Sequence, residues 1–294
     1  MNVRIGINPL TWSNDDLPSL GRDISLETCL REAAATGYAG VELGHKFPRQ
    51  PRTLGPILAK HKLALVSGWY SLRLLERDAA AEFEAMQPHM ELLTALGSNV
   101  MVCAEVTGAV HSDMNSRLSR RPQLTKAPFD TFAERLSELA GRMRARGTRL
   151  AYHHHMGTVI QSEAEIDALM AACQPQVELL LDTGHLAFAG GDPVRAARNH
   201  AARIAHVHCK DIRPDVLQRT CNADSSFLEA VLQGVFTVPG DGCIDYEAVF
   251  APLREAKYKG WLVIEAEQDP AIADPVTYAT KGFETLRRLS APWV

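Results

Sequence analysis

Three consecutive histidines, His153, His154 and His155, are the residues in this sequence with the clearest potential for chemistry. They lie in the stretch LAYHHHMGT, whose first residues are typical of a buried β-strand. Successive side chains of a strand point to opposite faces, so His153 and His155 share one face and His154 points the other way. Two imidazoles on one face indicate a metal or polyol site, and the alternative is a core histidine that bonds only to its surroundings.

Further metal ligands end the later apolar runs. Asp182 closes LLLD, His208 lies in AHVHCKD, and Glu265 lies in LVIEAE. Together with one of His153 and His155 they offer two imidazole nitrogens and two carboxylates. This donor set suits Zn, Mn, Co or Fe better than Ca or Mg.

Each of these polar residues also has a purely structural explanation. Asp182 can cap the turn that follows it, Glu265 can pair with Lys210, and Glu267 can be a charge on the exposed rim. His206 lies deeper in its strand and is the expected core histidine. The metal hypothesis gains weight because the donors come from four different strand ends.

The elements that position these residues are about eight short apolar runs that alternate with amphipathic stretches. Continuously apolar runs are typical of parallel strands that are covered on both faces. The sequence therefore predicts an α/β fold, a (β/α)8 TIM barrel, as a single domain over 1–294 because no change of composition marks a linker. The runs are VRIGIN, GVELG, LALVSG, NVMVCAEV, RLAYHHH, VELLLD, RIAHVHCKD and GWLVIEAE.

Helix boundaries can be read from capping residues. Ser25 is the expected N-cap of a helix that ends at Gly37. Ser162 followed by Glu165 forms a capping box. The stretch DYEAVFAPLREAKYKG is expected to be helical until Gly260.

Two connections are too long for simple turns, at 107–128 and 212–244. The second contains SSFLEAVLQG, which predicts an extra helix. Both follow strands, so both are expected on the carboxyl-terminal face of the barrel, where barrel enzymes keep their active sites. They are candidate lids, and the alternative is that they are inert insertions.

Composition excludes several classes of function. The chain has 294 residues, 46% hydrophobic and 22% charged, with a net charge of -4, which argues against binding to nucleic acid or to an anionic membrane. No apolar run reaches the length of about 18–20 residues that spans a membrane, and the N-terminus has no signal-peptide pattern. Six scattered cysteines without a CxxC pair indicate free thiols and a cytoplasmic protein.

The order of the strand-end motifs LDTGH, HVHCKD and LVIEAE resembles that of the xylose isomerase-like barrels. This resemblance implies one divalent metal held by a Glu, an Asp, a His and a Glu from four strands. Asp182, His208 and Glu265 match three of these positions, and His153 replaces the first Glu. The substitution makes the site one charge less negative and argues against a pair of glutamates that act as acid and base, as in epimerases.

Longer motifs narrow the resemblance. IGINPLTWSNDDLP, GVELGHKFP, GWYS and YHHHMGT resemble the myo-inosose-2 dehydratases of inositol catabolism. This implies a lyase that removes water from 2-keto-myo-inositol (scyllo-inosose) to give a trihydroxycyclohexane-1,2-dione, with Mn2+ or Co2+ as the metal and Zn2+ as a further option. The implied partner is a small-molecule polyol ketone, and the resemblance is compatible with a homo-oligomer. The alternatives are a sugar or inosose isomerase or epimerase on the same metal-binding barrel, a barrel nuclease of the endonuclease IV type, and a non-catalytic polyol-binding protein. The nuclease is disfavoured because SGWYS offers no histidine and the net charge is negative.

Dehydration next to a ketone needs a base for the α-proton and an acid for the departing hydroxyl. The expected bases are Glu265 and Glu42, and the expected acids are His155 and Lys210, although Lys210 can instead pair with Asp211 or Glu265. Further polar and aromatic residues near strand ends are candidates for binding the substrate, and core packing is the alternative for the aromatic ones. These candidates are Asn8, Trp12, Trp69, Tyr70, His185, Asp241 and Glu267.

Overall fold

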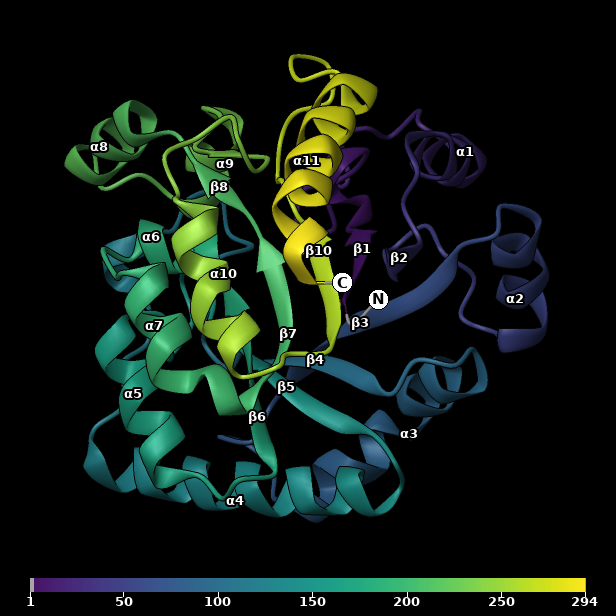
Figure 1. Cartoon of the computed structure of the whole chain (residues 1–294). Helices are drawn as coiled ribbons and strands as arrows, with labels where there is room; N and C mark the ends of the chain where they lie inside the picture. The colour runs from purple at the N-terminus through teal and green to yellow at the C-terminus, as the bar shows by residue number, and fades with distance from the viewer. Residues whose placement is uncertain (1–2, 294) are drawn as a thin grey trace.

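Eight parallel strands close into a barrel in the order β1-β10-β7-β6-β5-β4-β3-β2, which confirms the predicted fold (Figure 1). The structure is a computed structural model and describes residues 3–293. Two further short strands, β8 and β9, pair antiparallel outside the barrel. The strands are β1 Val3–Ile7, β2 Gly40–Leu43, β3 Ala64–Leu72, β4 Val100–Glu105, β5 Arg149–His153, β6 Val177–Asp182, β7 Ile204–Cys209, β8 Asp211–Ile212, β9 Phe236–Thr237 and β10 Gly260–Ile264.

Helices surround the barrel and connect its strands (Figure 1). They are α1 Leu26–Thr36, α2 Pro51–Lys60, α3 Ala79–Ala95, α4 Lys126–Ala145, α5 Glu163–Ala172, α6 Thr183–Phe188, α7 Pro193–His200, α8 Pro214–Asn222, α9 Phe227–Leu232, α10 Tyr246–Glu255 and α11 Pro275–Ser290. Short 3-10 helices cover Pro9–Thr11, Leu118–Arg120, Ala201–Arg203 and Ala291–Trp293. Within residues 3–293, no helix combines the length and the apolar character that crossing a bilayer requires.

Local sequence signals fix most helix ends. The Ser25 hydroxyl accepts a hydrogen bond from the amide of Thr28, and α1 ends at Gly37 in the left-handed region. The capping box at the start of α5 is also present, as predicted. One boundary was wrong: α10 ends at Glu255, well before Gly260, because Lys257 adopts a positive φ of 57° and turns the chain into β10.

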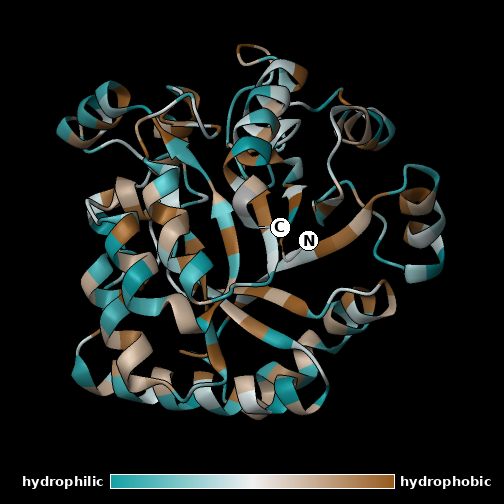
Figure 2. Cartoon of the chain, in the orientation of Figure 1, coloured by the Kyte–Doolittle hydropathy of each residue, from teal (hydrophilic) through white to brown (hydrophobic). Residues whose placement is uncertain are grey.

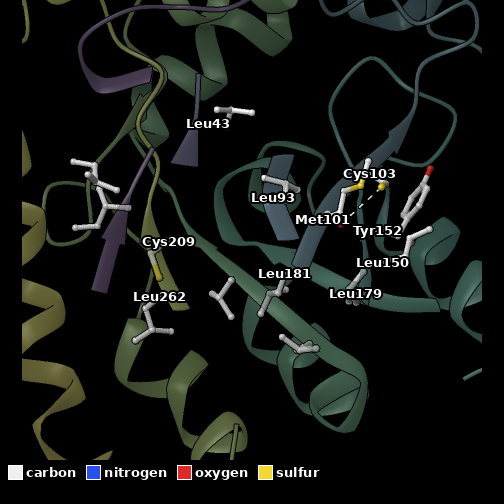
Figure 3. Close-up of a cluster of buried hydrophobic side chains, with 14 of the residues drawn as sticks. Leu43, Leu93, Met101, Cys103, Leu150, Tyr152, Leu179, Leu181, Cys209 and Leu262 are labelled. Atoms are coloured by element: carbon white, nitrogen blue, oxygen red, sulfur yellow. Dashed lines mark hydrogen bonds between the residues drawn. The ribbon is translucent and has the colours of Figure 1, made fainter. Parts of the chain in front are cut away.

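The apolar core lies between the outer face of the barrel and the helices (Figure 3). Leu150 and Tyr152 point outward from β5, and Leu179 and Leu181 do so from β6. Figure 2 shows the corresponding pattern, with brown concentrated on the strands and teal on much of the helical periphery. Successive side chains of a strand point to opposite faces, so Ala151, between Leu150 and Tyr152, faces the barrel interior.

A smaller apolar layer fills the interior of the barrel below the polar strand ends. It consists of Val100, Val102, Ala151, Leu180 and Ala205, with Trp69 packed against it. His153 follows Ala151 on the same inward face of β5. The polar residues at the strand ends therefore lie directly above an apolar layer.

The two long connections form one packed unit at the carboxyl-terminal ends of the strands. The Ser119 hydroxyl donates to Asp224 at 2.6 Å, and Arg117 pairs with Ser226 in an isolated antiparallel bridge. The predicted extra helix is α9, whose Phe227 lies in an apolar cluster with residues from both connections. Their location is as predicted, and the contacts between them argue for a fixed cover; movement as a lid stays a prediction.

Candidate metal centre

Four buried side chains bring one potential ligand atom each within 4.8 Å of one another: His153, Asp182, His208 and Glu265. They come from the ends of β5, β6 and β7 and from the residue after β10. Nδ1 of His208 lies 2.8 Å from Oε2 of Glu265 and 3.5 Å from Oδ2 of Asp182. Nε2 of His153 lies 3.7 Å from the same Asp182 oxygen. The barrel register therefore brings the four predicted ligands together.

Both imidazoles turn one ring nitrogen toward this cluster. Nδ1 of His153 donates to the carbonyl oxygen of His154 at 2.6 Å, which places the lone pair on Nε2. Nε2 of His208 lies 3.1 Å from Glu42 and donates to it, so Nδ1 is the atom that faces Asp182 and Glu265. A neutral imidazole with a fixed tautomer is the form that binds metal.

The residues fit a divalent cation. Oδ2 of Asp182 is buried and has no hydrogen-bond partner among the described residues, whereas Oδ1 accepts from the amide of His185 at 2.7 Å. A buried carboxylate oxygen without a partner is costly. Although burial alone lowers the pKa of His208, the carboxylates of Glu265 and Glu42 raise it well above its ordinary value. The site thus attracts positive charge, which a metal ion provides.

Glu42 holds His208, a candidate ligand, in place. It is buried and accepts hydrogen bonds from Asn8 at 2.7 Å, Ser67 at 2.6 Å and His206 at 2.8 Å in addition to His208. These four donors occupy the carboxylate, and although burial raises its pKa, His208 and His206 lower it well below its ordinary value. The predicted role of Glu42 as general base does not fit this geometry, because no lone pair is left for the substrate. His206 is a buried partner of Glu42, consistent with its predicted structural role.

Lys210 forms a buried cation beside the metal ligands. Its Nζ lies 2.6 Å from Oε1 of Glu265, 2.6 Å from Oε1 of Glu267 and 3.0 Å from Nε2 of His185. The ion pair with Glu265 that the sequence left open is present, whereas Asp211 accepts backbone amides instead. Although burial lowers its pKa, Glu265 and Glu267 raise it above its ordinary value, so the group is an ammonium ion.

A second group of potential ligands, His155, His185 and Glu267, also lies within 4.8 Å. The Lys210 ammonium contacts His185 and Glu267 directly. The position that a second metal would take therefore already contains a positive charge.

A pocket of about 250 Å³ opens above the candidate metal site. Of the predicted site residues it is lined by Asn8, Glu42, Trp69, His153, His155, His208, Glu265 and Glu267. The Trp69 ring lies 5.4 Å from the rings of both His153 and His155 and forms one wall. Such a cavity, smaller than a typical drug-sized site of about 300 Å³ or more, suits a ligand of single-ring size.

The description of the family model that matches residues 30–289 is xylose isomerase-like TIM barrel. The chain belongs to this family. Its barrel closure is the fold that the sequence motifs predicted, and the four strand-end residues predicted as ligands lie together.

Named members of the xylose isomerase-like family are similar over nearly their whole length. The chain is 49% identical to the rhizopine catabolism protein MocC of Rhizobium meliloti, covering 99% of this chain and 90% of the relative. It is 42% identical to an inosose dehydratase of Geobacillus thermodenitrificans, covering 97% and 96% of the two chains. Among solved structures, the IOLI protein with a bound zinc atom matches with a TM-score of 0.69 at 15% identity, over 99% of both chains, a likeness of fold.

His155 lines the pocket as a neutral imidazole, a protonation state that the sequence did not reveal. Its Nδ1 donates to the carbonyl oxygen of Met156 at 2.8 Å, so Nε2 carries a lone pair. Burial lowers the pKa of His155 well below its ordinary value, and His111 and Lys210 lower it further. A neutral imidazole that presents a lone pair acts as an acceptor or a base, so the predicted acid role of His155 is revised.

Four predicted substrate contacts, Trp12, Tyr70, Asp241 and His185, do not line the pocket. Trp12 is buried behind it and donates to Glu32 on α1 at 2.7 Å. Tyr70 follows Trp69 on β3 and therefore points outward, where its ring lies 5.9 Å from that of His89. These two predictions were wrong because adjacent residues of a strand cannot share a face and because the chain after β1 folds Trp12 toward α1.

Asp241, the third, pairs with Arg213 at 2.8 Å and with Lys281, and accepts from Thr237 at 2.7 Å. It anchors the connection that leads into α10. His185 does not line the pocket but lies beneath it, with its ring 3.8 Å from that of His155. Its predicted alternative role, orienting neighbours, is the one that the geometry allows.

The pocket also contains residues that the sequence did not single out as site residues, namely Asp15, Asp16 and His111. The aspartates follow the first strand in PLTWSNDD, and His111 lies in the long connection after β4. Their position after strand ends was the only available signal, because irregular loops have no periodicity that assigns a side chain to a face.

Proposed function

We propose that this chain is a hydro-lyase that removes water from 2-keto-myo-inositol (scyllo-inosose) and forms a trihydroxycyclohexane-1,2-dione. The observation that carries the proposal is the mixed His, Asp, His, Glu cluster at the floor of a small pocket in a barrel. Relatives at 40–42% identity over at least 95% of this chain are named inosose dehydratase, which supports this substrate class.

The proposed metal is Mn2+ or Co2+, with Zn2+ as a further option, because two imidazoles and two carboxylates suit these ions. His153 through Nε2, His208 through Nδ1, and the carboxylates of Asp182 and Glu265 would hold it. When bound, the metal supplies a Lewis acid that stabilises negative charge on the ketone oxygen as the α-proton leaves.

The chain's own groups divide the proton transfers between two sides of the pocket. Nε2 of His155 faces the pocket with a lone pair and takes the α-proton of the substrate. Glu267 also lines the pocket beside Lys210; burial raises its pKa to about 7, and in its protonated form it gives a proton to the departing hydroxyl. Glu265, the other predicted base, has Oε1 bonded to Lys210 and Oε2 beside His208, so its proposed role is ligation.

Apolar side chains surround the buried charged groups of the site. The floor is the apolar layer that includes Val102, and Phe227 and Phe236 cover His185 and Lys210 from the side of the long connections. A dry site strengthens each electrostatic interaction within it. A cytoplasmic location and a homo-oligomer remain proposals, which cell fractionation and light scattering test.

The deciding experiment adds back Mn2+, Co2+, Zn2+ or no metal to chelator-treated protein and supplies scyllo-inosose. Metal-dependent growth of the ultraviolet absorbance of an enolised diketone is the expected result. Parallel NMR in D2O separates the alternatives, because an isomerase or epimerase incorporates deuterium without loss of water. Deuterium exchange without dehydration would overturn the lyase.

A second candidate role follows from the 49% identical relative, which is named for rhizopine catabolism. Deletion of the gene and growth on rhizopine or on myo-inositol as the sole carbon source tests it. A growth defect on rhizopine alone would favour this second role.

A further inference from the structure

His111 and Asp16 reach the pocket from two different loops. His111 lies in the connection after β4, and Asp16 lies in the segment between β1 and α1. Nε2 of His111 is 3.9 Å from Oδ1 of Asp16, and both residues line the pocket. Neither is among the potential ligands of the metal cluster.

Both side chains have unused hydrogen-bonding capacity. Nδ1 of His111 is buried and has no partner among residues 3–293. In the same range no hydrogen bond is accepted by the Asp16 carboxylate, although the neighbouring Asp15 accepts from both the amide and the ring of His45. A buried nitrogen without a partner is unusual, and the Asp16 side chain, 32% exposed, is open to a ligand in the pocket.

The loop is anchored so that His111 is held over the pocket. The amide of Val110 donates to the carbonyl oxygen of Gly157 at 3.0 Å. Gly157 has a φ of +78°, and a Cβ there would lie 2.9 Å from the backbone nitrogen of His111. The His111 ring packs edge-on against that of His155 at 4.9 Å. The glycine of the HHHMGT stretch thus makes room for this loop.

We infer that His111 and Asp16 form a subsite that binds ring hydroxyls of the substrate on the loop-lined side of the pocket, and that this subsite selects polyols over simple hydroxy ketones. The inference rests on the proposed substrate class. Burial lowers the pKa of His111 even though Asp16 raises it, so the imidazole is neutral and offers one donor and one acceptor. A hydroxyl group of the substrate can likewise donate to and accept from this imidazole. The Asp16 carboxylate can accept a hydrogen bond from a second hydroxyl group.

The test pairs variants of the protein with changes of the substrate. His111→Ala and Asp16→Asn are compared with wild type on scyllo-inosose and on analogues that each lack one hydroxyl. His111→Asn, which keeps a donor and an acceptor, guards against a simple loss of packing, and His200→Ala, at the end of α7, is the matched control. Circular dichroism and melting curves establish that each variant is folded.

Both pocket variants should raise KM about tenfold and change kcat by no more than about threefold relative to wild type. The reason is that a hydrogen bond made equally in the ground state and in the transition state contributes to binding and not to the chemical step. For at least one analogue, the loss seen with wild type should vanish in His111→Ala. If removal of each hydroxyl lowers the activity of the variant by the same factor as that of wild type, the subsite does not exist. If wild type does not turn over scyllo-inosose, the proposed function fails instead, and calorimetric binding of the same analogues decides the inference separately.

Discussion

The Glu42 carboxylate lies 3.1 Å from Nε2 of His208, and Nδ1 of the same ring faces Asp182 and Glu265. A carboxylate that holds a metal-binding histidine by its other nitrogen fixes the ring and makes it a better ligand. The barrel thus connects β2 to the candidate metal site through one imidazole.

Glu42→Gln should lower metal affinity about 10–100-fold, the usual effect of losing such a partner. Chelator titration followed by metal analysis measures it. Glu105→Gln is the matched control, since Glu105 is a buried strand-end carboxylate that accepts from Leu74 and Thr107 and lies outside the site. Equal metal retention in Glu42→Gln and wild type would contradict the assigned role.

His153→Ala should weaken metal binding more than Glu42→Gln does, because it removes a ligand atom. His153→Glu should retain a divalent ion, since it restores a carboxylate at this position, but should lose dehydratase activity. His154→Gln provides the comparison: His154 points away from the cluster and accepts from the amide of Asp182 at 3.3 Å. Unchanged metal content in His153→Ala would exclude this residue as a ligand.

Lys210→Met should destabilise the protein by about 3–5 kcal/mol, because it leaves Glu265 and Glu267 buried without their cation. Urea unfolding curves measure the change. Lys281→Met removes a half-exposed pair with Asp241 and should cost at most about 1 kcal/mol. A Lys210→Met protein as stable as wild type would show that Lys210 does not offset the buried negative charge of Glu265.

As the pH falls from about 6.5 to 4, His89 should contribute to a loss of stability, together with other buried histidines whose pKa is lowered, such as His111 and His155. Burial lowers the pKa of His89 to about 4, and Nε2 has no hydrogen-bond partner among the described residues. An unfolded chain takes up the proton near pH 6.5, so protonation favours unfolding throughout this range, by up to ~3 kcal/mol at the acid end. His89→Leu should reduce the slope of the melting temperature against pH in this window, whereas His61→Leu should not. Parallel curves for His89→Leu and wild type would refute the assignment.

The sequence by itself predicted the barrel, because continuous apolar runs and capping residues are local signals. It also predicted the four potential ligands, because the carboxyl ends of parallel strands converge wherever the barrel closes. Strand periodicity also implies that Trp69 and Tyr70, as neighbours on one strand, cannot both face the pocket.

Only the tertiary structure decided what surrounds these ligands. Glu42 became the partner of His208, and His155 took the tautomer that exposes a lone pair, because both depend on hydrogen bonds formed in the folded chain. His111 and Asp16 reach the pocket through irregular loops whose path is fixed by long-range contacts such as that between Val110 and Gly157. Local sequence patterns determine elements, whereas side-chain direction in loops and proton positions on histidines follow from packing between distant segments.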